Sequence, residues 1–208
     1  LLLLLLCVAL IARAQDDNSV KQDIQNTAEI LTSSDDKLTV GGYGEVHFNQ
    51  ILNKDVRYNG TLDVHRLVMF LGYNFSAGTQ FISEIEFEHV SEVYVEQMYL
   101  QQKLNKYINL QAGLLLVPMG IINLYHEPTT FNGVERPLID NKLAPTTWRE
   151  IGFGAQGNIS EAMLKYQLYV MNGFSGYDGT SAIFSGSKGF RSGRQKGAES
   201  YISSPNIA

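Results

Sequence analysis

Glutamates stand at every second position of one short segment of the chain. Glu84, Glu86 and Glu88 alternate with Ile85 and Phe87. In an extended strand this spacing places the carboxylates on one face and the apolar side chains on the other. On the wall of a narrow water-filled passage, a row of carboxylates repels anions and favours cations. The alternative is a solvated strand face whose charges are balanced by neighbouring strands.

Further charged residues in segments with the same period are expected on the same wet face. Arg66 is one candidate counter-charge for the glutamates, and Glu45, His47 and Lys165 belong to the same predicted network. The complete set of predicted pore-lining residues is Glu45, His47, Arg66, Glu84, Glu86, Glu88 and Lys165.

Residues 119–147 form a long segment without a clear hydrophobic period. A link of this length inside a compact fold is usually functional. We predict a loop that folds inward and narrows the passage, and the alternative is a surface loop over its mouth. The predicted constriction residues are His126, Glu127, Glu135, Arg136, Asp140 and Arg149.

Other kinds of chemistry find little support in the sequence. His126 has no second histidine at the helical spacing of a zinc pair, so no metal site is predicted. We find no nucleophile paired with a base and no glycine-rich phosphate loop. The chain is therefore predicted not to be an enzyme and to need no cofactor.

Apolar and polar residues alternate with a period of two from residue 38 to about 173. This pattern predicts strands at about 38–52, 62–75, 79–89, 93–104, 107–117, 149–157 and 162–172. Strand 93–104 alternates poorly because Glu96 shares a parity with Met98 and Leu100, so its facing stays open. Strands of about ten residues with one apolar face fit a tilted crossing of a bilayer.

The expected links between these strands differ in length. Short links at 76–78, 105–106 and 158–161 alternate with long ones at 53–60, 119–147 and from 173 onward, apart from a brief link near 90–92. Membrane barrels have short turns on one side and long loops on the other, whereas a soluble β-sandwich has no reason to sort its loops. We predict an all-β fold: residues 38–208 as part of a transmembrane antiparallel up-and-down β-barrel, with about seven strands present and the C-terminal half missing.

The N-terminal residues indicate an exported protein. Residues 1–14 combine an apolar run with a small-x-small cleavage pattern at Ala12-Arg13-Ala14, which predicts a truncated signal peptide; the alternative is a buried core helix. Residues 15–37 are expected to be a periplasmic extension, either a short helix or disordered. Cys7 lies in the leader, so the mature chain has no thiol chemistry. The predicted location is the bacterial outer membrane.

Composition leaves the fold open but limits the partners. The chain has 19 Gly, 11 Tyr and 10 Phe, and its hydrophobic fraction of 44% is ordinary for a soluble domain. A net charge of −5 argues against a nucleic-acid partner, which would require a basic face. Arg191, Arg194 and Lys196 lie in a Gly/Ser-rich segment that we expect to be a mobile extracellular loop, with lipopolysaccharide phosphate as its candidate contact.

One segment resembles a known family. Residues 113–120, Gly-Leu-Leu-Leu-Val-Pro-Met-Gly, are similar to the Gly-Gln-Phe-Lys-Val-Pro-Phe-Gly strand end of the phosphate-selective porins of pseudomonads and their Bacteroidetes relatives. Supporting similarity lies in Asp63-Val64-His65-Arg66-Leu67 and in Val134-Glu135-Arg136-Pro137. The resemblance spans about residues 38–200. It implies homotrimers of large porin barrels through which small hydrophilic solutes diffuse passively.

The departures from that family concern the substrate. Leu116 stands where the family has Lys, and Arg66 alone remains of the arginines in the second strand. Because a phosphate site needs several fixed Lys or Arg donors, phosphate selectivity does not carry over. Two alternatives to a channel stay open: an outer-membrane barrel enzyme of the lipase or protease type, and a soluble β-sandwich that binds a carbohydrate or a partner.

Overall fold

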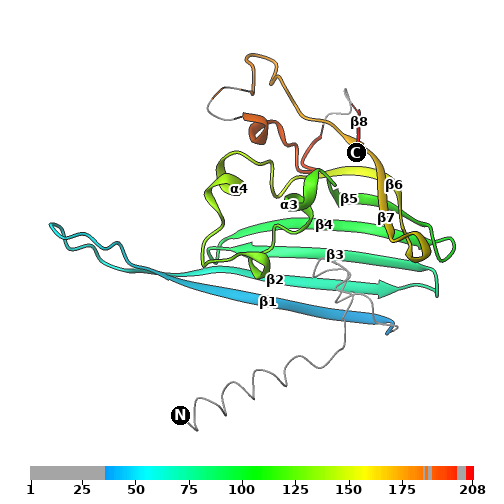
Figure 1. The fold of residues 1–208 in the computed structure, drawn as a ribbon, viewed down its shortest axis with the longest axis horizontal. Coiled ribbons are helices and arrows are strands. Elements are labelled where there is room, and N and C mark those ends of the chain that lie inside the picture. Colours follow the sequence, from blue (N-terminus) through cyan, green and yellow to red (C-terminus); the bar gives the residue numbers. More distant parts are fainter. Residues whose placement is uncertain (1–35, 185, 187–188, 201–204) are drawn as a thin grey trace, which may run out of the picture.

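The computed structural model describes residues 36–184, 186, 189–200 and 205–208. The predicted leader and nearly all of the predicted extension, residues 1–35, lie outside this part of the chain. The described chain is all-β and builds one antiparallel up-and-down sheet in the order β1 to β8 (Figure 1). Its strands are β1 (Leu38–Asn49), β2 (Thr61–Asn74), β3 (Thr79–Glu88), β4 (Glu92–Lys103), β5 (Asn109–Leu116), β6 (Arg149–Ile159), β7 (Leu164–Asn172) and β8 (Pro205–Ile207).

All seven strands predicted from the hydrophobic period are confirmed, with ends that shift by a few residues. An eighth strand, β8, was not predicted. It has three residues and begins with a proline, so it carries no detectable period, and it becomes a strand because it pairs with the end of β7. The sheet is open, with β1 and β8 at its edges, and is not closed into a barrel.

The links are sorted by length between the two ends of the sheet. Residues 50–60, 117–148 and 173–204 connect strands at one end, together with the short turn 89–91, while 75–78, 104–108 and 160–163 are short and lie at the other. The helices are α3 (Gly120–Leu124), η1 (Pro128–Thr130), α4 (Leu138–Lys142), η2 (Ser160–Ala162) and η3 (Gly189–Gly193). Within the described residues, no helix has both the length and the apolar character required to cross a bilayer.

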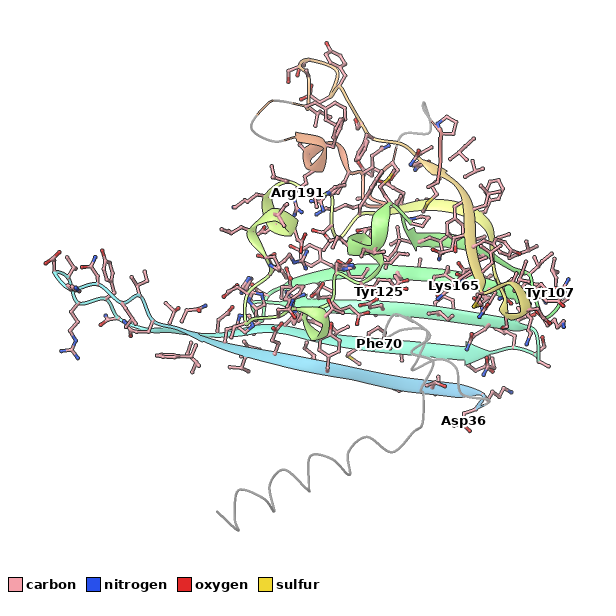
Figure 2. The ribbon with its side chains drawn as sticks, viewed as in Figure 1. Asp36, Phe70, Tyr107, Tyr125, Lys165 and Arg191 are labelled. Carbon is pink, nitrogen blue, oxygen red and sulfur yellow. The ribbon has the colours of Figure 1, made fainter. Side chains whose placement is uncertain are left out.

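The two faces of the sheet are opposite in character. Leu38, Val40, Val46 and Phe48 of β1 are all exposed, while Tyr43, Glu45 and His47 on the other face are covered to differing degrees. In β2 and β3 the burial alternates in the same way, with Arg66, Val68, Ile82 and Glu84 buried, so the predicted faces of the first three strands are confirmed. The segment that carries α3, η1 and α4 lies over the polar face (Figures 1 and 2).

Two β-bulges interrupt the alternation. Glu45 pairs with Arg66 but Val46 pairs with Val64, so His65 is an extra residue in β2. Glu84 pairs with Gln97 but Ile85 pairs with Val95, so Glu96 is an extra residue in β4. Because a bulge reverses the parity of the strand beyond it, Glu96 and Gln97 are both buried while Val95 and Met98 are exposed. The bulge explains why the facing of this strand could not be decided from its period.

Apolar residues on the covered face form the core. Val68, Phe70, Ile82, Tyr99, Leu115, Val117, Trp148, Tyr169 and Met171 make one buried cluster. The Tyr169 ring lies against Gly154 of β6, and its hydroxyl donates to Gln111 Oε1 at 2.6 Å. A Cβ atom at Gly154 would lie within 3.0 Å of the Leu168 carbonyl oxygen and of the Tyr169 ring. Gly154 therefore provides the space in which Tyr169 packs.

We expect Gly154→Ala to destabilise the fold by about 1–3 kcal/mol, because the added methyl group overpacks a filled site. Denaturant unfolding of the purified protein measures this change. Gly44→Ala is the matched control: it is also a strand glycine, but its nearest neighbours would lie at 3.7 and 3.9 Å. Equal free energies of unfolding for the two variants would contradict the packing role assigned to Gly154.

Candidate functional site

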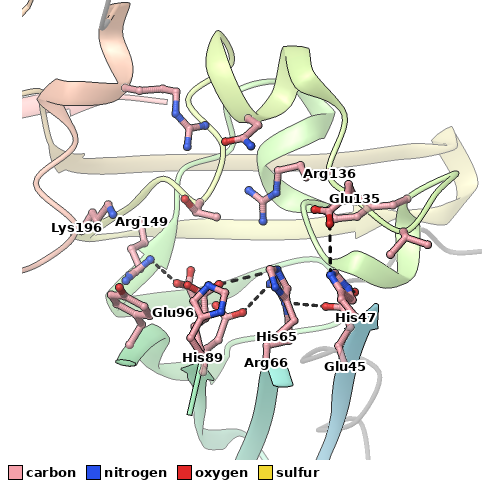
Figure 3. A pocket seen from close by; sticks show the side chains of 18 residues that line it. Glu45, His47, His65, Arg66, His89, Glu96, Glu135, Arg136, Arg149 and Lys196 are labelled. Atoms are coloured by element: carbon pink, nitrogen blue, oxygen red, sulfur yellow. Dashed lines mark hydrogen bonds and ion pairs between the residues drawn. The ribbon is translucent and has the colours of Figure 1, made fainter. Parts of the chain in front are cut away.

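Charged side chains gather in a cavity between the polar face of the sheet and the two long links. The cavity has a volume of about 320 Å³. Strands β1 to β4 and β6, the turn after β3, the 117–148 link and the segment around η3 contribute its lining (Figure 3). It lies at the end of the sheet where the long links gather. This placement makes it the strongest candidate for a functional site.

Arg66 is the centre of the charge network on the strand side. Its Nε lies 2.8 Å from Glu45 Oε2, its Nη1 lies 2.6 Å from Glu86 Oε1 and its Nη2 lies 3.6 Å from Glu88 Oε1. One guanidinium thus serves carboxylates on the strands at both sides of β2. The predicted role of Arg66 as a counter-charge matches these contacts.

The three glutamates of β3 do not form a uniform solvated row. Glu84 is 4% exposed and accepts a hydrogen bond from Gln97 Nε2 at 2.6 Å. Glu86 is bound to Arg66, and only Glu88 is appreciably exposed at the cavity wall. We predicted either a row of carboxylates on a passage wall or a strand face whose charges neighbouring strands balance. Glu86 fits the second alternative, while Glu84 is buried beside the Gln97 amide and fits neither.

A second buried ion pair joins β4 to β6. Arg149 Nη1 lies 2.5 Å from Glu96 Oε1, and both side chains are 5% exposed. His126 Nε2 lies 3.9 Å from the other oxygen of Glu96, while its Nδ1 donates to the Asn123 carbonyl at 2.7 Å. Burial lowers the pKa of His126 to about 4. The imidazole is therefore neutral at pH 7, and Arg149 is the charged partner of Glu96.

The 117–148 link is attached to β1 by a polar bridge. Asn49 Nδ2 donates to Glu135 Oε1 at 2.9 Å, and His47 Nδ1 lies 3.6 Å from the same oxygen. His47 Nε2 is 2.7 Å from Glu45 Oε1, and the His47 ring stacks on His65 with centroids 4.2 Å apart. The link therefore folds over the polar face and contacts it directly.

Cations line the link side of the cavity. Arg136 Nη1 donates to Thr146 Oγ1 at 3.1 Å, and Arg191 Nη1 donates to the carbonyls of Asp140 and Ala144 at 2.9 and 2.8 Å. Arg194 donates to Thr147 Oγ1 at 2.8 Å. The basic segment with Arg191 and Arg194, for which we predicted a mobile loop, instead packs against the 117–148 link. The hydrogen bonds that hold it there join residues far apart in the sequence, so the spacing of its basic residues could not predict them.

One asparagine fixes both ends of that link. Asn123 Nδ2 donates to the carbonyls of Val117 and Trp148 at 2.8 and 2.7 Å, and its Oδ1 accepts from the Trp148 amide at 2.8 Å. Asn123 is buried, as is Trp148, whose ring stacks on Phe174. This arrangement closes the link at the sheet and sets the direction in which it folds.

Eight of the thirteen predicted site residues line the cavity, and five do not. Lys165 is exposed on β7 and Asp140 belongs to α4, and neither lines the cavity. Those that line it are Glu45, His47, Arg66, Glu86, Glu88, Glu135, Arg136 and Arg149. Glu84, His126 and Glu127 are buried outside the lining. Lys165 was included in the pore-lining set because of its parity in the strand. Parity gives the face on which a residue lies but not its position along the strand.

The prediction missed several lining residues: His65, His89, Tyr94, Glu96, Arg191 and Lys196. Two of them have a common cause, since His65 and Glu96 are the extra residues of the two bulges. One sequence signal could have identified the missed histidines: the pattern Asp63-x-His65 on one strand, with His89 at the end of the next. Chemically, strand carboxylates face link cations across the cavity, so a polar solute there meets charges of both signs.

Comparisons with known proteins give one informative relative. An uncharacterized protein of Aquifex aeolicus (strain VF5) is 36% identical over 170 residues, which is 78% of this chain and 37% of that protein. The chain thus spans little more than a third of the length of this relative. No protein-family model matches the chain, and no solved structure matches it. The resemblance to the phosphate-selective porins therefore stays a prediction.

We expect Arg149→Met to destabilise the fold by about 3–5 kcal/mol, because it leaves the Glu96 carboxylate buried without its cation. The free energy of unfolding of the purified protein measures the loss. The double variant Glu96→Gln/Arg149→Met removes both charges and should recover most of it. If the double variant is as unstable as the single one, the pair does not act as a unit.

Proposed function

We propose that this chain forms the N-terminal part of a β-barrel porin of the bacterial outer membrane. In this proposal the protein is a water-filled channel for passive diffusion of small hydrophilic solutes or ions, including anions such as phosphate. Lipid and lipopolysaccharide surround it, it assembles as a homotrimer, and it has no enzymatic activity.

The inverted polarity of the sheet carries the proposal. Its exposed face is apolar on strand after strand, with Leu38, Phe48, Met98, Phe153 and Leu168 each about half exposed or more. The covered face holds Glu84, Glu86, Glu96, Arg66 and Arg149. A soluble protein rarely leaves a contiguous apolar surface of this extent in water. A barrel in lipid requires apolar residues outside and polar residues inside.

The sorting of the links supports the same reading. Membrane barrels combine short turns at one end with longer loops at the other, and the sheet has this asymmetry. The 117–148 link lies over the polar face and is fixed there by Asn123, Glu135 and Trp148. Inside a barrel such a segment would occupy the lumen and narrow the channel.

In this proposal, further strands of the complete protein close the barrel. The eight strands leave β1 and β8 as open edges, and an open edge is not tolerated in lipid. A relative of this chain is much longer than the part that aligns with it. We propose that additional strands of the complete protein pair with both edges, giving a barrel of about sixteen strands or more.

The charges at the cavity favour weak selectivity. Five glutamates (Glu45, Glu86, Glu88, Glu96 and Glu135) and five cations (Arg66, Arg136, Arg149, Arg191 and Lys196) line it. Arg66 and Arg149 are occupied by carboxylates, and Leu116 offers no charge where the resembling family has Lys. The cations that remain on the link side can attract anions, but the lining as a whole is close to neutral.

The first test asks whether the apolar face lies in lipid. Leu168→Arg should destabilise the protein in lipid vesicles by about 2–4 kcal/mol, because the substitution moves a charge into the bilayer near the middle of β7. Unfolding of the complete protein, reconstituted in vesicles, gives this number.

Leu138→Arg is the matched control for this measurement. Leu138 is 75% exposed in α4 and Leu168 is 60% exposed in β7, so a soluble protein would tolerate arginine at both positions. In the proposed barrel only Leu168 faces lipid. Similar small changes for the two variants would exclude the membrane assignment.

The second test concerns the link. Replacing residues 127–143 by a short Gly-Ser linker should increase the single-channel conductance of the complete protein in planar bilayers, because the narrowest section of a channel sets its resistance. The comparison deletion removes residues 53–58 from the β1–β2 link, which projects beyond the end of the sheet (Figure 1) and contributes no residue to the cavity lining. Unchanged conductance after the first deletion would show that the link does not narrow the channel.

A further inference from the structure

Three histidines of the cavity region lie beside carboxylates in a pattern that the proposed channel does not use. They are His47 on β1, His65 at the bulge of β2 and His89 in the turn after β3. Two overlapping groups bring their ligand atoms within 4.8 Å of one another: Glu45 with His47 and His65, and Asp63 with His65 and His89. Both combine imidazole nitrogens with a carboxylate oxygen, the donors that transition metals prefer.

The local backbone builds the second group. Asp63 and His65 are two positions apart on one strand, so their side chains leave it on the same side. The His89 amide donates to the His65 carbonyl at 3.2 Å, and His89 has a positive φ of 48°. These features hold the Asp63 carboxylate beside two imidazoles that line the cavity, and Figure 3 shows His65 and His89 as neighbours.

The distances between the ligand atoms are close to those of a metal site. Asp63 Oδ2 lies 3.1 Å from His65 Nδ1 and 2.8 Å from His89 Nδ1. Ligands bound tetrahedrally to Zn²⁺ at about 2.0–2.2 Å are separated from one another by roughly 3.3–3.6 Å, so each pair has to open by only a few tenths of an ångström to admit the ion. The rings of His65 and His89 stand at 86° to each other, which lets two in-plane lone pairs converge on one point.

The first group is a poorer candidate for physical reasons. Glu45 is already bound to Arg66 at 2.8 Å, so a cation would compete with the guanidinium. The rings of His47 and His65 are nearly parallel, at 12°, and lone pairs in parallel stacked rings do not converge. In the described part of the chain, no Lys or Arg forms an ion pair with Asp63.

The geometry points to a binding site for a divalent transition-metal ion of the Zn²⁺ class, held by Asp63, His65 and His89. Three protein ligands leave at least one coordination position open to water or a solute. The three side chains are 36%, 23% and 47% exposed, so an ion can reach them from solvent. Mg²⁺ and Ca²⁺ prefer oxygen ligands and suit this site poorly. The site does not depend on the proposed channel function.

Calorimetric titration of Zn²⁺ into the EDTA-treated complete protein tests the site. We expect one Zn²⁺ per chain, and Asp63→Asn and His89→Asn should each weaken binding by about 100-fold, since even loss of an outer-shell partner costs 10–100-fold. Asparagine at position 89 tolerates the positive φ. Thermal unfolding without metal should be nearly unchanged in both variants.

The control variant is His47→Phe, which keeps a ring to stack on His65 but has no nitrogen. It should bind Zn²⁺ like the unmodified protein. Loss of binding in His47→Phe with retention in His89→Asn would move the ion to the other group and overturn the assignment. Co²⁺ gives a second readout: visible absorption bands that EDTA abolishes are expected for the unmodified protein. No Zn²⁺ binding, or equal Mg²⁺ binding, would overturn the site itself.

Discussion

Neutralisation of buried carboxylates by two arginines is the interaction on which the covered face depends. Arg66 serves Glu45, Glu86 and Glu88, and Arg149 serves Glu96. An unpaired buried charge is strongly unfavourable, so β1, β3 and β4 would not hold these four glutamates on this face without the cations that β2 and β6 supply. The same contacts join neighbouring strands through their side chains as well as their backbones.

The bulges determine which charges meet. Had β2 and β4 kept a strict period of two, His65 and Arg66 could not share a face, and neither could Glu96 and Gln97. The extra residue in each strand brings both members of the pair to the covered side. Arg66 thereby reaches Glu86 from the bulge of β2, and Glu96 reaches Arg149 from the bulge of β4. Bulges often occur beside functional sites for this reason.

The long links complete the cavity that the strands begin. Asn123 closes the base of the 117–148 link, and Trp148 packs against Phe174 from the following link. Glu150 Oε1 accepts hydrogen bonds from the Trp148 indole at 3.0 Å and from the Gln195 amide at 2.8 Å. Arg191 and Arg194 then bind residues 140–147. Two segments distant in sequence are thus held as one cover over the polar face.

The sequence by itself determined the seven longer strands and the facing of those with strict alternation, because side chains in a strand alternate by geometry alone. It also identified Arg66 as a counter-charge and residues 119–147 as an unusual link. Tertiary structure decided the facing of β4, the strand β8 and the meeting of Asp63, His65 and His89. These features depend on register, bulges and pairing between segments far apart in the chain, and no local period records them. The position of Lys165 outside the cavity has the same origin, since parity gives the face of a residue but not its neighbours.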